Sequence, residues 1–153
     1  MPLPLKKILT DVTSEVLETM FFALPEPLLD SDLREPQITF DIRGSISLGG
    51  PQRLQLNLFL PKRMAAELSA NLLAIEPDEV DDEALLDTVR ELTNMIAGNL
   101  INRIGEDAGF EMGIPETSFG RATLPSSAVT EGQNVFIMIE EKLLMLTIRQ
   151  EGP

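Results

Sequence analysis

Two stretches of alternating residues joined by a glycine turn constrain the fold of this chain most strongly. Apolar side chains occupy every second position from Ile38 to Arg43, and again from Leu54 to Leu60. The turn Gly49-Gly50-Pro51 lies between them. Period-two alternation on both sides of such a turn is typical of a β-hairpin. The chain is therefore predicted to build at least part of its core on an antiparallel sheet.

A second hairpin is predicted near the end of the chain, from Val135–Ile139 and Leu143–Ile148 about the turn Glu140–Lys142. Its first strand is apolar at every position, whereas a strand with one face in water alternates. We therefore expect this strand to be central in the sheet and covered on both faces.

Three other segments show the three- and four-residue spacing of a buried helix face. They are residues 5–22, 64–73 and 83–104. Prolines follow the first two segments, and Gly105 follows the third, as is typical of helix ends. Two short extended stretches are expected around Phe110–Ile114 and Phe119–Leu124. This order predicts one α+β domain over residues 1–153, with helices packed on a largely antiparallel sheet.

Charge and missing residue types exclude several kinds of function. The chain has 12 lysines and arginines against 25 aspartates and glutamates, a net charge of −13. Such a surface repels nucleic acid and anionic membranes, so neither is expected as a partner. The absence of cysteine and histidine excludes thiol nucleophiles, Ser-His-Asp relays and the usual structural zinc sites.

The uninterrupted apolar runs are too short to cross a bilayer. The longest are five residues, Met20–Leu24 and Val135–Ile139, against the roughly 20 that a spanning helix needs. Lys6 and Lys7 do not begin a recognisable secretory segment, because Asp11 and Glu15 interrupt any apolar core after them. A cytoplasmic location is the simplest expectation.

An acidic run from Glu76 to Glu83 carries six carboxylates in eight positions. A calcium loop is one interpretation, but the glycine and the distant glutamate of an EF-hand are missing. The favoured interpretation is a solvated helix entry in which Asp81 or Asp82 caps the main helix. No metal site is predicted.

The main helix has two faces. Its buried stripe is formed by Leu85, Val89, Leu92 and Ile96. A polar face opposite it contains Asp87, Glu91, Asn94 and Gly98, with Ile101 nearby. A merely solvated face is the plain alternative, but Gly98 in mid-helix costs about 0.5 to 1 kcal/mol relative to alanine. This cost favours a face that another backbone or ligand approaches closely.

Glu91 and Asn94 are one helical turn apart and can reach into the same cleft. Neither is a convincing nucleophile, and an amide cannot act as a general base at neutral pH. An amide can, however, donate and accept hydrogen bonds at once, which suits it to hold a water molecule in line with a phosphoryl group. The pair therefore suggests hydrolysis of an activated phosphoryl group carried by a partner.

The first helix repeats part of this pattern. Asp11-x3-Glu15-x2-Glu18 matches the spacing of Asp87-x3-Glu91-x2-Asn94, and each helix is followed downstream by a hairpin. This echo is either chance or an internal repeat of a helix-plus-hairpin unit. If it is a repeat, only the second copy has an amide at its last position.

The main-helix motif, which continues from Asn94-Met-Ile-Ala-Gly98 to Asn99-Leu-Ile-Asn102, resembles the signature helix of the CheC/CheX/FliY chemotaxis phosphatases. The resemblance is closest to CheX. Pro115, 21 positions past Asn94, is a looser match to a proline of that family. Glu18 in place of asparagine places the chain with the CheX-type members, which use only the second helix.

The resemblance implies a phosphatase that acts on a phosphorylated CheY-like receiver domain of a response regulator. It implies that Asn94 orients the attacking water and that Glu91 pairs with the receiver's lysine. Asp87, Gly98 and Ile101 are then expected at the partner interface. The receiver supplies the phospho-aspartate and Mg²⁺, so no cofactor of the chain's own is expected. A homodimer associated through the sheets is also implied.

Two alternatives remain open at the level of sequence. One is a non-catalytic binding or scaffold module related to the middle domain of the flagellar switch protein FliM. The other is an effector that binds a phosphorylated receiver without hydrolysing it. Retention of both Glu91 and Asn94 favours the phosphatase over the scaffold.

Overall fold

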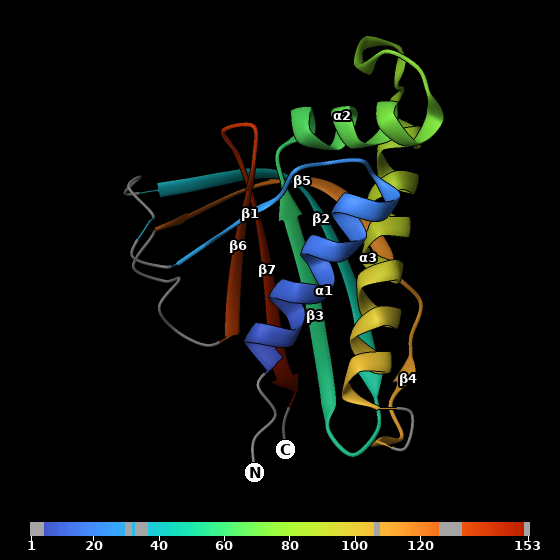
Figure 1. Ribbon diagram of the computed structural model, residues 1–153, viewed down its shortest axis with the longest axis vertical. Coiled ribbons are helices and arrows are strands. Elements are labelled where there is room, and N and C mark those ends of the chain that lie inside the picture. Colours follow the sequence, from blue (N-terminus) through green and yellow to red (C-terminus); the bar gives the residue numbers. More distant parts are fainter. Residues whose placement is uncertain (1–4, 30–31, 33–36, 106–107, 126–132, 152–153) are drawn as a thin grey trace.

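A computed structural model describes residues 5–29, 32, 37–105, 108–125 and 133–151. The helical elements are α1 (Leu5–Met20), α2 (Lys62–Leu73), the 3₁₀ turn η2 (Pro77–Glu79) and α3 (Asp82–Ile104). The strands are β1 (Glu26–Leu28), β2 (Gln37–Gly49), β3 (Arg53–Leu60), β4 (Glu111–Met112), β5 (Glu116–Pro125), β6 (Gln133–Ile139) and β7 (Lys142–Glu151). The three predicted helices and both hairpins are confirmed (Figure 1).

The strands form one antiparallel sheet in the order β1-β6-β7-β3-β2-β5, with β4 also paired to β2. The two halves of this sheet correspond strand by strand. From the outside inward, β1, β6 and β7 on one side match β5, β2 and β3 on the other. The hairpins β2–β3 and β6–β7 therefore lie side by side in the sheet, joined by the pairing of β3 with β7. Each half of the chain thus has a helix followed by a hairpin, which favours the internal repeat over the chance similarity that the sequence left open.

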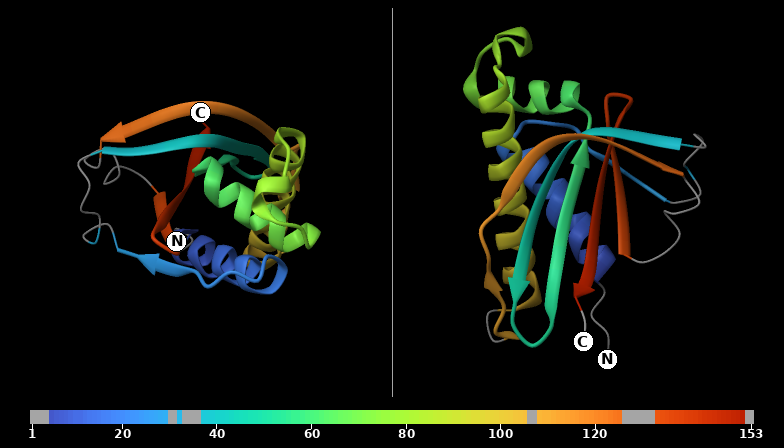
Figure 2. Two further views of the ribbon diagram at one scale, coloured as in Figure 1. Left: turned by 90° about the horizontal axis from the view of Figure 1, so that it is seen from above. Right: turned by 180° about the vertical axis from the view of Figure 1, so that it is seen from behind.

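Helices α1 and α3 lie side by side against one face of the sheet, and α2 crosses one end of the pair (Figures 1 and 2). The buried stripe predicted for the main helix is confirmed, since Leu85, Val89, Leu92 and Ile96 are at most 2% exposed. These side chains share one core cluster with the inward residues of β2, β3, β6 and β7. Burial of this apolar surface fixes which side of α3 faces water.

Gly44 of β2 allows that close packing. A Cβ atom at this position would lie 2.3 Å from the Oγ1 of Thr93 and 3.2 Å from a methyl carbon of Val89. Only glycine therefore lets the strand approach α3 this closely.

The predicted covering of β6 on both faces is also confirmed. Val135, Ile137 and Ile139 face the main core, whereas Phe136 joins Phe40 and Met145 in a second cluster. In the sheet, β6 lies between β7 and the three-residue β1.

Strand β1 was not predicted, because Pro25 and Pro27 indicate a helix end followed by a loop. Pro27 is tolerated because β1 is the last strand on its side of the described sheet. The two extended stretches after α3 do form strands, and each pairs with β2. Among the described residues, no helix is long and apolar enough to span a membrane.

Candidate functional site

Helix α3 begins and ends where its sequence predicts. The Asp81 side chain accepts a hydrogen bond from the Ala84 amide at 2.8 Å, and the Gly105 amide donates to the Ile101 carbonyl at 3.0 Å. Asp82 and Glu83 lie in the first turn, and Arg103 lies in the last, which matches the helix dipole. The helix is therefore a firm support for the side chains along its outer face.

The predicted polar face is a ridge of Asp87, Glu91, Asn94 and Gly98 that lies away from the core. Asp87 and Glu91 are exposed, whereas Asn94 and Gly98 are half-buried. Within the part of the chain that the structure describes, neither the Glu91 carboxylate nor the Asn94 amide has a hydrogen-bond or ion-pair partner. Both groups are thus available to a molecule that docks on the ridge.

Asp87, in contrast, is already engaged. The Arg90 guanidinium donates to its carboxylate at 2.7 Å, with both side chains about half exposed. A longer hydrogen bond of 3.4 Å joins the same guanidinium to the Thr117 hydroxyl of β5. Thr117 in turn donates to the Leu86 carbonyl at 3.1 Å. Asp87 and Arg90 therefore help to fix β5 alongside the ridge.

Gly98 and Ile101 have neighbours within the fold. A Cβ atom on Gly98 would lie 3.7 Å from the sulfur of Met112 in β4, an ordinary van der Waals distance. Ile101 is half-buried and packs against the main core. Of these two predicted partner contacts, Gly98 lies on the ridge, and Ile101 lies on the same face of α3 two turns after Asn94, with part of its side chain against the core.

Pro115 stands between β4 and β5, beside a surface hollow of about 570 Å³. The hollow is lined from α3 by Arg90, from β2 by Arg43 and Ser45, and from β5 by Thr117 and Ser118. Arg43 is held within the fold, since it donates to the Asn57 side chain at 2.9 Å and stacks over Phe59. The structure thus places Pro115 on the β5 side of the ridge.

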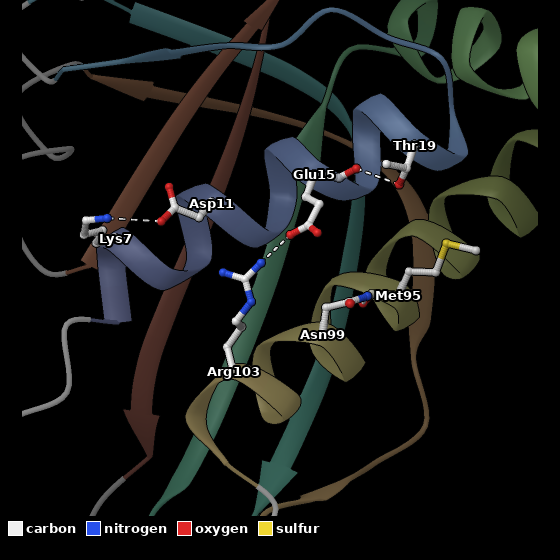
Figure 3. Close-up of polar contacts among 7 residues, drawn as sticks. All are labelled: Lys7, Asp11, Glu15, Thr19, Met95, Asn99 and Arg103. Atoms are coloured by element: carbon white, nitrogen blue, oxygen red, sulfur yellow. Dashed lines mark hydrogen bonds and ion pairs between the residues drawn. The ribbon is translucent and has the colours of Figure 1, made fainter.

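The corresponding face of α1 differs from the ridge in two respects. Its Glu15 carboxylate accepts a hydrogen bond from Arg103 of α3, as Figure 3 shows. Asp11 is paired with Lys7 at 3.3 Å, and Glu18 is exposed. The first copy of the motif therefore has a neutralised glutamate and lacks the amide.

Metal binding finds no support in the described residues, where no three carboxylates gather closely enough to hold an ion.

Sequence reasoning placed the ridge correctly because helical spacing fixes it. It missed Arg103 and Met112, whose contacts join residues far apart in the chain, and Arg90, whose spacing of three from Asp87 was the one local signal available. The exposed residues of the β4–β5 segment carried no periodic signal that could have marked them.

Comparisons with known proteins agree with this fold. Residues 42–140 match the family model described as chemotaxis phosphatase CheX. CheX from Vibrio vulnificus superposes with a TM-score of 0.78 at 22% identity, over 97% of this chain and 100% of that one. A CheC-like superfamily protein from Shewanella sp. PV-4 gives 0.73 at 25% identity, over 99% and 100%.

A CheX–CheY–BeF₃–Mg²⁺ complex from Borrelia burgdorferi shows the same fold with a TM-score of 0.62 at 17% identity, over 95% of this chain and 97% of that one. No curated protein matches the chain. The matched residues 42–140 include β3, the whole of α3 and β6, so the predicted resemblance is confirmed. The chain belongs to the family of the chemotaxis phosphatase CheX.

Proposed function

We propose that this protein hydrolyses the aspartyl phosphate of a CheY-like receiver domain. The observation that carries the proposal is the Glu91–Asn94 pair on the ridge of α3, one turn apart, neither of which has a polar partner in the described part of the chain. The family description as a chemotaxis phosphatase supports the activity. The complex of a CheX with CheY from Borrelia burgdorferi supports a receiver as the partner.

In the proposed reaction, Asn94 enters the receiver's active site and holds a water molecule in line with the phosphorus atom. The water oxygen bonds to phosphorus while the bond from phosphorus to the aspartyl oxygen breaks. The aspartate leaves as a free carboxylate, and the water's proton passes to the released phosphate or to solvent. Because an acyl phosphate is already activated, a positioned water is the main requirement.

Glu91 is proposed to bind and align the receiver through an ion pair with the receiver's lysine. A charge that is desolvated at an interface contributes to affinity mainly when its partner is correctly placed. Mg²⁺ is proposed to be held by the receiver, where it neutralises charge on the phosphoryl group. The chain's own residues then bind, orient the water and exclude bulk solvent.

The side chains of α1 explain why we propose that only α3 acts on the receiver. Glu15 on α1 is paired with Arg103, and the last motif position is Glu18, whose charge would repel a phosphoryl group. We therefore place the single site on α3. Action on a receiver also implies a cytoplasmic protein.

The test is to incubate the protein with candidate receivers that have been phosphorylated by a small-molecule phosphodonor, and to follow loss of the phosphoryl group. Acceleration over spontaneous decay is the expected result. Long-lived binding to the phosphorylated receiver without acceleration would instead support the relay effector. An absence of both binding and acceleration with all receivers would favour the FliM-like scaffold.

A further inference from the structure

Ile114 is a large apolar side chain that is 85% exposed, in the segment that joins β4 to β5. Single exposed apolar residues are common on protein surfaces and need no explanation by themselves. Ile114 differs in two respects, which are the rigidity of its backbone and its position along α3.

The segment around Ile114 is fixed on both sides. The Gly113 amide donates to the Ser47 carbonyl of β2 at 2.8 Å, and a Cβ atom on Gly113 would come within 2.9 Å of that same oxygen. On the other side, the Thr117 hydroxyl is bonded to the Leu86 carbonyl of α3. The backbone that carries Ile114 is therefore held in place by the sheet and the helix together.

The same contacts give the position of Ile114 along the ridge. The segment runs antiparallel to α3, because Met112 lies at Gly98 whereas Thr117 lies at Leu86. At the rise of an extended chain, the two residues that follow Met112 advance the backbone by about 6.6 Å, which equals roughly four helix residues at 1.5 Å each. Four residues before Gly98 is Asn94, so this rise places Ile114 at about the height of Asn94 along the helix axis.

We propose that Ile114 is the apolar anchor of the receiver interface, packing against an apolar side chain next to the receiver's phosphorylation site. This inference rests on the proposed function, since the receiver is its occupant. Interfaces commonly combine a buried apolar anchor with a polar rim. Here Ile114 supplies the anchor, and Glu91 and Glu116 supply the rim.

A second copy of this chain fits the surface less well. Glu91 and Glu116 are exposed carboxylates on α3 and at the start of β5, the two elements that flank Ile114, and the chain carries a net charge of −13. A two-fold contact centred on Ile114 would bring these carboxylates close to their own copies. A receiver that offers a lysine to Glu91 removes this repulsion.

The experiment compares Ile114→Asp with a matched control, Leu24→Asp. Leu24 is 86% exposed and leads into β1, at the opposite end of the strand order from β5. Each variant is titrated with a CheY-like receiver loaded with Mg²⁺ and beryllofluoride, which stands in for the phosphoryl group. Ile114→Asp is expected to raise the Kd about ten-fold or more, whereas Leu24→Asp and Ile114→Leu leave it within about two-fold of the parent.

Turnover of the phosphorylated receiver separates binding from chemistry. Ile114→Asp should raise KM and preserve kcat, because the side chain lies beside the reacting atoms and does not touch them. Unchanged affinity of Ile114→Asp would overturn the inference while leaving the proposed function intact. The inference would also be overturned if Ile114→Asp changed the molar mass measured by light scattering and left receiver binding unaltered. That result would assign Ile114 to a contact between two copies of the chain. If the parent binds no receiver, the proposed function fails, and this inference fails with it.

Discussion

The Arg103 guanidinium of α3 donates to the Glu15 carboxylate of α1, so an ion pair joins the two helices that share one motif spacing (Figure 3). Glu15 holds the position in α1 that Glu91 holds in α3. The pair is about half exposed, and such pairs contribute only about 0.2 to 1 kcal/mol to stability. Its larger consequence is that the glutamate of the first copy is already occupied.

Restoring the amide to α1 should therefore not create a second active site. In an Asn94→Ala background, Glu18→Asn completes the Glu-x2-Asn motif on α1, but Glu15 remains paired with Arg103. We expect this double variant to be as inactive as Asn94→Ala alone in the phosphate-loss assay. Recovery of dephosphorylation in the double variant would show that the ion pair does not block the first copy.

Asn94→Ala should separate turnover from binding. The substitution keeps the helix but leaves the attacking water unpositioned, and loss of one preorganised group commonly lowers a rate by about 10²-fold or more. The Kd for a beryllofluoride-loaded receiver should change little, as measured by titration. An Asn94→Ala protein that dephosphorylates its receiver at the parental rate is incompatible with the proposed role.

Two conservative variants test the amide itself. Asn94→Asp preserves size but places a negative charge beside the phosphoryl group, so its rate should also fall. Asn94→Gln keeps the amide but displaces it by one methylene, and a small residual activity is expected. An Asn94→Asp rate equal to that of the parent would show that an amide is not required.

Glu91→Ala should weaken the complex with the receiver. Truncating one side of a desolvated charge pair costs roughly 2 to 5 kcal/mol, so the Kd measured by titration should rise by at least ten-fold. Glu83→Ala is the matched control, because Glu83 is an exposed carboxylate two turns earlier on the same helix. If the two substitutions raised the Kd equally, Glu91 would affect affinity only through the general surface charge.

Gly98→Ala should change stability and affinity in opposite directions. Outside the backbone of α3, the added methyl meets the Met112 sulfur at an ordinary 3.7 Å among the described residues, so alanine should raise the free energy of unfolding by about 0.5 to 1 kcal/mol. On the ridge, the same methyl should weaken receiver binding. A denaturant melt and a receiver titration measure the two effects, and a more stable variant with parental affinity would remove Gly98 from the interface.

The resemblance also predicts a homodimer. Within the described chain, β5 is an outer strand that pairs with β2 alone, and such an edge offers unpaired backbone groups to another copy. Light scattering at micromolar concentration should give twice the mass of the chain. A monomeric mass at this concentration would exclude the dimer as the working form.

The sequence by itself determined the helices, the hairpins and the ridge, because each depends on a local period. Spacing of three and four residues aligns Glu91 with Asn94 on one side of α3, whatever the rest of the chain does. In the same way, the alternation of Leu54, Leu56, Leu58 and Leu60 fixed which face of β3 packs on the core, and Asp81 and Gly105 marked the ends of the helix.

Only the tertiary structure decided the contacts between these pieces. Strand β1 forms despite Pro27 because an outer position in the sheet does not need the missing amide hydrogen. The pairing of Glu15 with Arg103 spans 88 positions, and the Thr117 hydroxyl is bonded across 31 positions to the Leu86 carbonyl. No local period records such contacts, because they depend on how two surfaces pack. For that reason the sequence revealed Asn94, whereas only the fold revealed that the segment carrying Ile114 is anchored between the sheet and α3.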